Sequence, residues 1–299
     1  MRVDPFYVVN LSSALDQTEV TQQQLSEELS SGLSFSSIGQ NPVAAAENVQ
    51  LLNQIQSDDS FTQTTSLTQG MLQVTDSALG SVVTQLNQAL SLATQANNGT
   101  LNASDLKSIS NQIAGIRNEV LSLANTNYQG QYVFGGSETS SAPFTLDDTT
   151  TPATVTYNGD SDVSTLVSPN AQSIQLNLPG NQVFTSSTAN VLGTLNNLVA
   201  DYASGVPGSG VADTAALDSA LNYVGQQRVT IDNSITRLTA ASGVATNEAT
   251  QLTAVQTNLM QADVASVSTN LSLSESQQSA LVSVIASLGQ GSLFDKLEA

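Results

Sequence analysis

The side chains in this sequence that could do chemistry are pairs of closely spaced carboxylates. Asp160 and Asp162 flank Ser161, which is the spacing of the acidic ligands that open a calcium-binding loop. The glycine and the distal glutamate that complete such a loop do not follow, so the sequence argues against a metal site. Asp147 and Asp148 could form a general acid and base pair, but adjacent side chains on a turn diverge. We therefore predict that Asp147 and Asp148 lie on a solvated turn.

The rest of the catalytic repertoire is small. The chain has no Cys and no His, which excludes disulfides and thiolate metal sites and removes the commonest general base and zinc ligand. We therefore predict a protein that is not an enzyme, with no catalytic residue, no cofactor and no metal.

The charge of the chain argues against two classes of partner. There are 6 Lys and Arg residues against 25 Asp and Glu residues, giving a formal net charge of −19. Because no basic stripe could neutralise phosphates, neither nucleic acid nor an anionic membrane is an expected partner. The short apolar run at residues 6–9 follows Asp4 and Pro5 and lacks a small-residue cleavage site, so we expect no cleaved secretory signal.

The first element that could position these groups is a helix near the N-terminus. Its apolar residues recur at helical spacing, and Ser31–Gly32 predicts its end. The stripe consists of Leu11, Leu15, Leu25 and Leu29.

Two further helices are expected to follow. Asn41–Pro42 predicts the start of a second helix, because proline in the first turn lacks an amide that would be unpaired there anyway. Its register runs in steps of three and four through Leu67, Met71, Val74, Ala78, Val82, Leu86, Ala89 and Ala93. After a turn at residues 97–99, Ser104 is expected to cap a third helix that folds back antiparallel to the second.

The C-terminal half predicts a longer helix. Apolar and small residues from Leu217 to Leu252 alternate steps of four and three, which predicts a helix of about 45 residues and about 70 Å. Its stripe needs partners of similar length, so we expect it to pack on the second and third helices. A short helix is expected before it, over residues 191–202.

A last helix is expected to begin at Ser274, with Gln277 completing a capping box. Its apolar face consists of Leu281, Val284, Ile285 and Leu288. We predict that it pairs with the helix of residues 11–31.

Between residues 129 and 184 the spacing of apolar residues changes. Strands are expected at residues 132–134, 154–157 and 173–178, separated by turns that contain Gly, Pro and Asp. This pattern predicts a small β-rich domain inserted between the helices.

The two terminal helices share a physical problem. Each is apolar along one face only and contains many Ser and Thr residues, which are weak helix formers. We hypothesise that these faces, together with Leu293 beyond them, are buried when many copies pack side by side. The alternative is an intramolecular coiled coil in a monomer, and composition and periodicity do not decide between the two.

Several motifs resemble those of the flagellin superfamily. The first helix closes with Ser31–Gly32, and after a loop the chain reads Asn41–Pro42–Val43–Ala44–Ala45. Residues 75–79, 96–100 and 120–126 are similar to helices of the same superfamily. These stretches would fit filament flagellin equally well.

Another set of residues resembles the hook-filament junction branch of that superfamily. These residues are Tyr132, Phe134, Gly135, Gly136, Pro143, Phe144, Tyr157, Gly159 and Asp160. The aromatic residues are expected to anchor a strand, and Gly135–Gly136 would let the backbone turn sharply into the inserted domain. The ending at residues 292–297 is also similar to this branch.

Periodicity and resemblance together predict a mainly α fold with an inserted β-rich domain, in an elongated rod of long antiparallel coiled-coil helices formed by the N- and C-terminal segments. Residues 1–42 and 263–299 would form a terminal coiled-coil domain, and residues 43–130 and 206–262 a helical rod domain. Residues 131–205 would form the inserted β-rich domain with a short helix.

The resemblance implies a structural subunit that joins hook to filament as a ring, after export through the flagellar type III system. The implied partners are further copies of the chain, the first hook-filament junction protein, flagellin and an export chaperone. The implied location is the extracellular flagellum, reached without a cleaved signal peptide. Filament flagellin is the alternative function, and a secreted adhesin or lytic enzyme on a helical stalk is a third reading.

Overall fold

The computed structural model describes residues 5–290, and residues 1–4 and 291–299 lie outside the description. The helices are α1 (Pro5–Ser31), α2 (Pro42–Ala96), α3 (Ala103–Ala124), α4 (Gly180–Val183), α5 (Val191–Ala203), α6 (Val211–Met260) and α7 (Val264–Gln290). The predicted fold class, long helices with a small β-rich insertion, is confirmed. No described helix combines the length and apolarity needed to cross a membrane.

The chain forms two compact units. One, the terminal unit, comprises residues 1–57 and 248–299, and the other, the central unit, comprises residues 58–247. The terminal unit holds α1 and α7, and the central unit holds α3, α5 and all the strands. Helices α2 and α6 contribute residues to both units.

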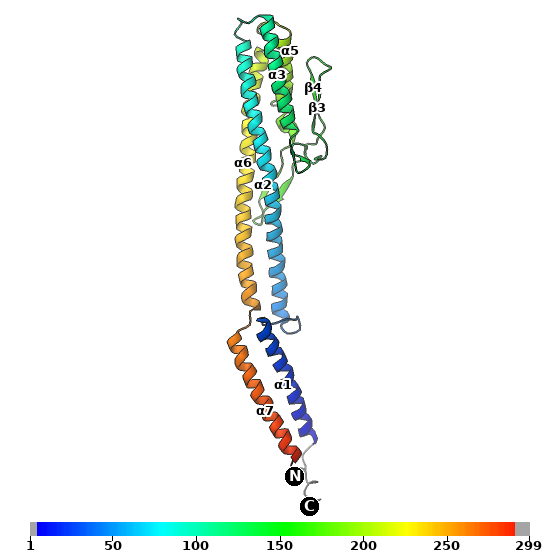
Figure 1. Ribbon diagram of the computed structural model, residues 1–299, viewed down its shortest axis with the longest axis vertical. Coiled ribbons are helices and arrows are strands. Elements are labelled where there is room, and N and C mark those ends of the chain that lie inside the picture. Colours follow the sequence, from blue (N-terminus) through cyan, green and yellow to red (C-terminus); the bar gives the residue numbers. More distant parts are fainter. Residues whose placement is uncertain (1–4, 291–299) are drawn as a thin grey trace, which may run out of the picture. The chain divides into compact units, whose positions relative to one another are not determined.

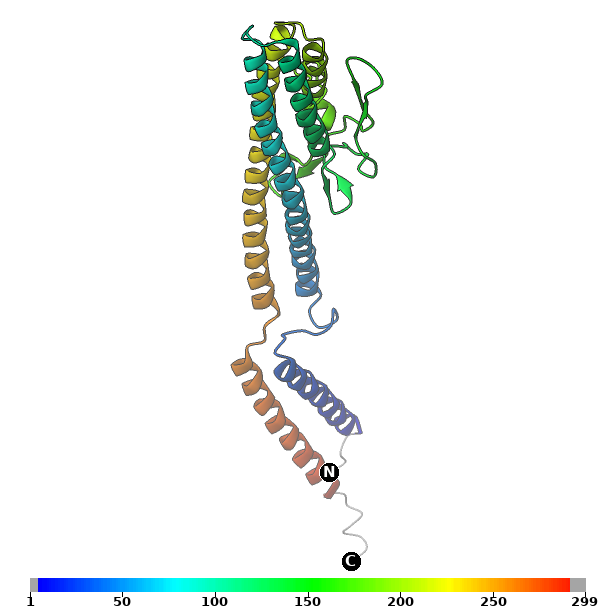
Figure 2. The same ribbon diagram turned by 45° about the horizontal axis from the view of Figure 1, so that its top comes forward.

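The hydrophobic core of the central unit lies between α2, α3, α5 and α6 (Figures 1 and 2). Fully buried members are Leu79, Val82, Leu86, Ile113, Val120, Leu195, Leu198, Leu217 and Val224. An ion pair between Arg228 Nε and Asp76 Oδ1, 2.8 Å apart, joins α6 to α2. The expected packing of the long C-terminal helix on the second helix is therefore observed, and the third helix contributes to the same core.

One position of the predicted stripe on α2 is wrong. Leu67 is 58% exposed, whereas Thr65 and Leu72 are fully buried. The buried register runs on through Thr75 and Leu79, so a polar threonine, not a leucine, occupies the core position of this turn.

The sequence also misplaced two helix starts. Asn102, not Ser104, caps α3, because its side chain accepts hydrogen bonds from the Ser104 and Asp105 amides at 2.9 and 3.0 Å. Helix α7 begins at Val264, not Ser274, and Asp263 Oδ1 accepts from the Ala265 amide at 3.1 Å.

The insertion holds three separate two-stranded antiparallel ladders and no larger sheet. They are β1 (Asn127–Tyr128) with β2 (Gln131–Tyr132), β3 (Phe144–Asp147) with β4 (Thr154–Tyr157), and β5 (Thr165–Val167) with β6 (Ser173–Gln175). The strand predicted at residues 154–157 is confirmed as β4.

The other two predicted strands are too long. Val133 and Phe134 form a turn in which both consecutive side chains are buried, unlike the alternation of a half-buried strand. Beyond Gln175, the Asn177 side chain accepts from the Ser164 amide at 2.8 Å and donates to the Asp162 carbonyl at 3.0 Å. One more backbone bond, from the Leu176 amide to the Ser164 carbonyl at 2.9 Å, follows Gln175, and beyond it the Asn177 side chain takes the place of the ladder.

Candidate functional site

The terminal unit pairs α1 with α7, which run side by side in opposite directions (Figure 1). This is the pairing that the sequence predicts. Five of the predicted interface residues are half-buried: Leu11, Leu15, Leu25, Leu281 and Ile285. Leu29 and Val284 are 38% and 39% exposed. The side chain of Leu288 and the whole of Leu293 lie outside the described part of the chain.

The pair buries little of its own apolar surface. Among the described side chains of α1 none is fully buried, and among those of α7 only Val267 and Ser274 are. Large apolar side chains lie on the outer surface instead, namely Phe6, Tyr7, Val9, Val20, Val264, Leu273 and Val282. We take these exposed apolar side chains as a candidate interaction surface.

Grooves run between the two helices. One, of about 670 Å³, is lined by Gln22, Ser26 and Leu271 among others, and another, of about 380 Å³, by Thr21, Leu25 and Leu273 among others. A long polar contact joins α1 to α7, with Gln278 Nε2 3.4 Å from Glu19 Oε1. Aliphatic contact also holds the pair together.

The connections that enter and leave this pair are better fixed. Gly32, with a φ of +70°, ends α1, and its carbonyl accepts from the Ala262 amide at 2.9 Å. The Ser34 amide donates to the Met260 carbonyl at 2.7 Å. Phe35 is buried with Ala44 and Ala45 against Leu259 and Met260. The Ser31–Gly32 and Asn41–Ala45 motifs therefore meet in one small cluster.

The structure brings the second group of motif residues together at the base of the β3–β4 hairpin. Tyr157 Oη donates to the Phe134 carbonyl at 3.0 Å and the Asp160 carbonyl at 2.7 Å. The Asp160 amide donates to the Gly135 carbonyl at 3.1 Å. Phe144 faces Tyr157 across the ladder, with ring centroids 5.0 Å apart.

The other members of this group lie beside these five. Pro143 is buried, and its carbonyl accepts from the Asn158 amide at 2.7 Å. Tyr132 pairs with Asn127 and is half-buried. At Gly136, which has a φ of +75°, and at Gly159, an added Cβ would meet Asp160 and the Tyr157 ring respectively. Glycine at these two positions thus allows close packing at this base.

Two residues of this base were not identified from the sequence. Phe184 packs edge-on against Phe134 at 5.1 Å and Phe144 at 5.4 Å. The Asn125 side chain accepts from the Phe144 amide and donates to its carbonyl, both at 2.9 Å. Phe184 is about fifty residues from Phe134 in sequence, so no local spacing reveals the contact.

The pKa shifts of Tyr157 and Asp160 at this base favour the protonation states in which both residues form the observed hydrogen bonds. Burial raises the pKa of Tyr157 to about 12, so its hydroxyl stays protonated and keeps donating. Hydrogen bonds from the Ser137 hydroxyl and the Ser137 and Asp162 amides lower the pKa of Asp160. The carboxylate of Asp160 thus closes a turn. Asp162 takes part in this turn through its backbone amide. Within residues 5–290, no three His, Cys, Asp or Glu side chains cluster as a metal site.

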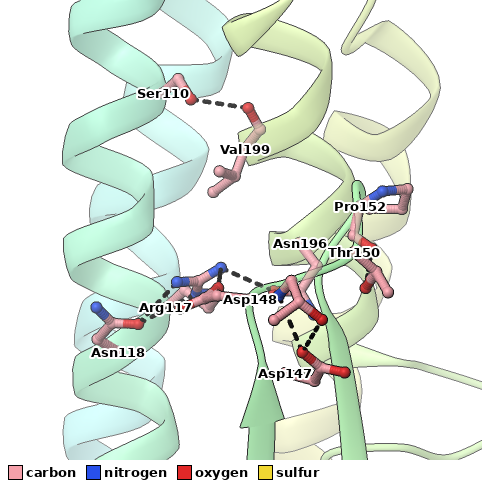
Figure 3. A network of polar contacts seen from close by, with 10 residues as sticks. Ser110, Arg117, Asn118, Asp147, Asp148, Thr150, Pro152, Asn196 and Val199 are labelled. Atoms are coloured by element: carbon pink, nitrogen blue, oxygen red, sulfur yellow. Dashed lines mark hydrogen bonds and ion pairs between the residues drawn. The ribbon is translucent and has the colours of Figure 1, made fainter.

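The carboxylates of Asp147 and Asp148 diverge, as predicted for a turn. Asp147 Oδ1 accepts from the Thr149 amide at 2.9 Å, and hydrogen bonds from Thr149 lower the pKa of Asp147. Asp148 Oδ1 instead lies 2.9 Å from Arg117 Nη1 on α3 (Figure 3). The Arg117 side chain is 6% exposed and that of Asp148 is 62% exposed.

Arg117 is a buried cation that ties three elements together. Its Nη1 lies 3.4 Å from Asn196 Oδ1 on α5, and its Nη2 lies 3.0 Å from Asn118 Oδ1 (Figure 3). Nearby, the Ser110 hydroxyl of α3 donates to the Val199 carbonyl of α5 at 2.7 Å. The network fixes the end of the β3–β4 hairpin to the helices, and none of its groups is arranged as a nucleophile and base.

Comparison with known proteins gives a consistent result. Residues 7–139 match the family described as the bacterial flagellin N-terminal helical region. The chain is 29% identical over 182 residues to flagellar hook-associated protein 3 of Salmonella typhimurium, covering 60% of this chain and 55% of that protein. It is 33% identical over 120 residues to flagellar hook-associated protein 3 of Escherichia coli, covering 40% of this chain and 38% of that protein. The matches therefore span about half, or less, of these two relatives.

A solved structure shares the fold. The flagellar hook-associated protein-3 from Legionella pneumophila aligns with a TM-score of 0.61 at 14% identity. The alignment covers 70% of this chain and 98% of that one. At this identity the likeness is one of fold.

Proposed function

We propose that this chain is a member of the flagellin superfamily and a structural subunit of the bacterial flagellum that joins the hook to the filament. The observation that carries the proposal is the α1–α7 pair, whose large apolar side chains lie mostly outside the contact between the two helices. A pair of this kind becomes stable when neighbouring copies cover it, and coupling of order to assembly suits a polymer subunit.

In this proposal the stripe predicted from the sequence serves two contacts, one within the α1–α7 pair and one with neighbouring copies. Leu11, Leu15, Leu25, Leu281 and Ile285 would hold α1 against α7, and the more exposed Leu29 and Val284 would contact neighbours. The terminal unit would then be the polymerising part of the chain. The helical rod and the inserted β-rich domain, at residues 131–205, would form the remainder of the subunit.

We assign partners on the same basis. Further copies of the chain would form a ring, with the first hook-filament junction protein on one side and flagellin on the other. An export chaperone would hold the C-terminal end before transit through the flagellar type III system. No catalytic role is part of the proposal.

Filament flagellin is the second candidate, because the matched N-terminal helical region is named for flagellin. The two relatives reported above, both hook-associated proteins, favour the junction role. The two functions predict different stoichiometry, since a junction ring needs few copies and a filament needs many.

The test is deletion of the gene in its own bacterium, followed by electron microscopy and analysis of the medium. We expect bare hooks and abundant secreted monomeric flagellin, with filaments restored by the wild-type gene. Filaments of normal length in the deletion strain would exclude the junction role. Loss of the major filament protein itself would identify this chain as flagellin.

A matched pair of variants tests the assembly surface. Leu29→Asp places a carboxylate on a partly exposed apolar position of α1, and Gln24→Asp adds the same charge at an exposed polar position. We expect Leu29→Asp to be secreted but not incorporated, whereas Gln24→Asp restores filaments. Equal function of both variants would show that the apolar surface is not an assembly contact.

A further inference from the structure

The sequence contains two Asn-Gly pairs, Asn98–Gly99 and Asn158–Gly159. In such a pair the backbone nitrogen of glycine can attack the side-chain amide carbon of asparagine, because glycine has no side chain to obstruct the approach. The reaction needs freedom of the asparagine side chain and an available glycine nitrogen. The two pairs differ in the freedom of the asparagine side chain and in the space around the glycine.

Asn98–Gly99 lies in the turn between α2 and α3. Both residues are exposed, and Gly99 has a φ of +70° with nothing within 4 Å of the position where a Cβ would lie. Within the described residues, neither the Asn98 side chain nor the Gly99 amide makes a hydrogen bond. Both reacting groups are therefore free.

Hydrogen bonds fix both ends of this turn, so the residues without such bonds lie in its middle. Asn97 Nδ2 donates to Thr214 Oγ1 at 2.8 Å, and Tyr202 Oη lies 3.3 Å from Asn97 Oδ1. On the other side Asn102 caps α3. Residues 98–100 are exposed and lie between these two anchors.

Asn158–Gly159 has the same sequence in a constrained setting. The Asn158 amide donates to the Pro143 carbonyl at 2.7 Å, and Asn158 Nδ2 lies 3.3 Å from Thr145 Oγ1. A Cβ on Gly159 would meet the Gly135 carbonyl and the Tyr157 ring, both at 2.6 Å. The approach of the Gly159 nitrogen to the Asn158 amide would require this base of the hairpin to open.

We propose that Asn98 is a site of spontaneous, non-enzymatic modification, and that the fold protects Asn158 from the same reaction. The Gly99 nitrogen attacks Asn98 Cγ, a C–N bond forms, and the side-chain nitrogen leaves as ammonia, giving a five-membered succinimide. Water then adds to either carbonyl of the ring and breaks one C–N bond. The products are aspartate, with the normal backbone, and isoaspartate, whose backbone runs through the former side chain.

Each product changes the turn. Either one adds a negative charge to a chain whose formal net charge is already −19. Isoaspartate also lengthens the backbone by one carbon between α2 and α3. Because the flanking anchors involve Asn97 and Asn102 and not Asn98, we expect the helices on both sides to survive the change.

The test is incubation of the purified full-length chain at mildly alkaline pH, followed by peptide mapping with mass spectrometry and enzymatic methylation of isoaspartate. We expect Asn98 to react at least about tenfold faster than Asn158 in the folded chain, since a local opening free energy of only about 1.4 kcal/mol gives that factor. In denaturant the two sites should react at similar rates. Equal rates in the folded chain, or an unchanged Asn98, would overturn the proposal.

Variants separate the proposed chemistry from general degradation. Asn98→Gln keeps an exposed amide but removes the five-membered ring, so isoaspartate should disappear from this peptide. Tyr157→Phe removes the hydroxyl that holds the hairpin base, so it should accelerate Asn158 and leave Asn98 unchanged. Acceleration of both sites by Tyr157→Phe would contradict a local protective role of the fold.

Discussion

At the scale of single residues, the hydroxyl of Tyr157 joins the segment at Phe134 to the turn that follows β4. It donates to the carbonyls of Phe134 and Asp160, and its ring packs on Phe144. Burial raises the pKa of Tyr157 to about 12, so the phenol keeps its proton at neutral pH. The contact is therefore structural over the whole physiological range.

The variant Tyr157→Phe should lower the free energy of unfolding by about 1–2 kcal/mol, because it removes the partly buried hydroxyl that donates to the Phe134 and Asp160 carbonyls. Denaturant unfolding monitored by circular dichroism would measure this loss. Tyr132→Phe is the matched control, since no hydrogen bond of the Tyr132 hydroxyl exists within the described structure. A loss of similar size in both variants would show that the effect does not come from the hydrogen bonds of Tyr157.

A second residue-scale prediction concerns Asp201. Burial, followed by a hydrogen bond and charge repulsion from Asp213, raises the pKa of Asp201 in the folded chain. A raised carboxyl pKa contributes stability below the unfolded pKa, and this contribution is lost as pH rises through the folded value. Asp201→Asn should therefore raise Tm at neutral pH. The difference from wild type should shrink toward about pH 4, and a constant difference would contradict the mechanism.

At the scale of elements, glycines inside helices differ in whether there is room for a side chain. A Cβ on Gly115 of α3 would meet nothing within 4 Å, whereas a Cβ on Gly70 of α2 would lie 2.6 Å from the Tyr128 hydroxyl oxygen. Gly115→Ala should stabilise the monomer by up to about 1 kcal/mol through helix propensity alone. Gly70→Ala should gain less or destabilise, because Tyr128 must move. Thermal unfolding of both variants would show whether this difference exists.

The helices were predictable because their apolar periodicity is long and regular. Helix ends were harder, and α7 shows why. The hydroxyls of Ser268 and Thr269 donate to the carbonyls four residues earlier, at 2.7 and 2.8 Å. Weak helix formers are thereby accommodated inside the helix, so a break that composition suggested near Ser274 does not occur.

The motif at the hairpin base was predictable only in part. Residues with special backbone demands, such as Gly135 and Gly136, are visible in sequence. The partners that complete the base, Phe184 and Asn125, are ordinary residues whose role depends on long-range contact. The buried Arg117 was also missed, because nothing in its local sequence distinguishes it from a solvated arginine on a helix.

At the scale of the whole molecule, burial is distributed unevenly between the two units. The central unit has a continuous buried core, whereas α1 has no fully buried side chain among those described. In the purified monomer, hydrogen exchange should therefore be fast in α1 and α7 and slow in α3, α5 and the 72–93 segment of α2. Exchange in α1 and α7 should slow markedly on incorporation into flagella. Strong protection of these helices in a dilute monomer would contradict assembly-coupled ordering.

Several hydroxyls of α7 donate to carbonyls of their own helix, and this affects how easily a neighbouring molecule can cover α7. Ser276 and Ser279 each donate to the carbonyl four residues earlier, so part of their hydrogen-bonding capacity is satisfied without water. Short side chains also have fewer rotamers to lose than lysine or glutamate would. A neighbouring molecule that covers α7 therefore displaces loosely held water and freezes little motion. Replacing these serines by glutamate would leave the helix intact but make every such contact entropically and electrostatically more difficult.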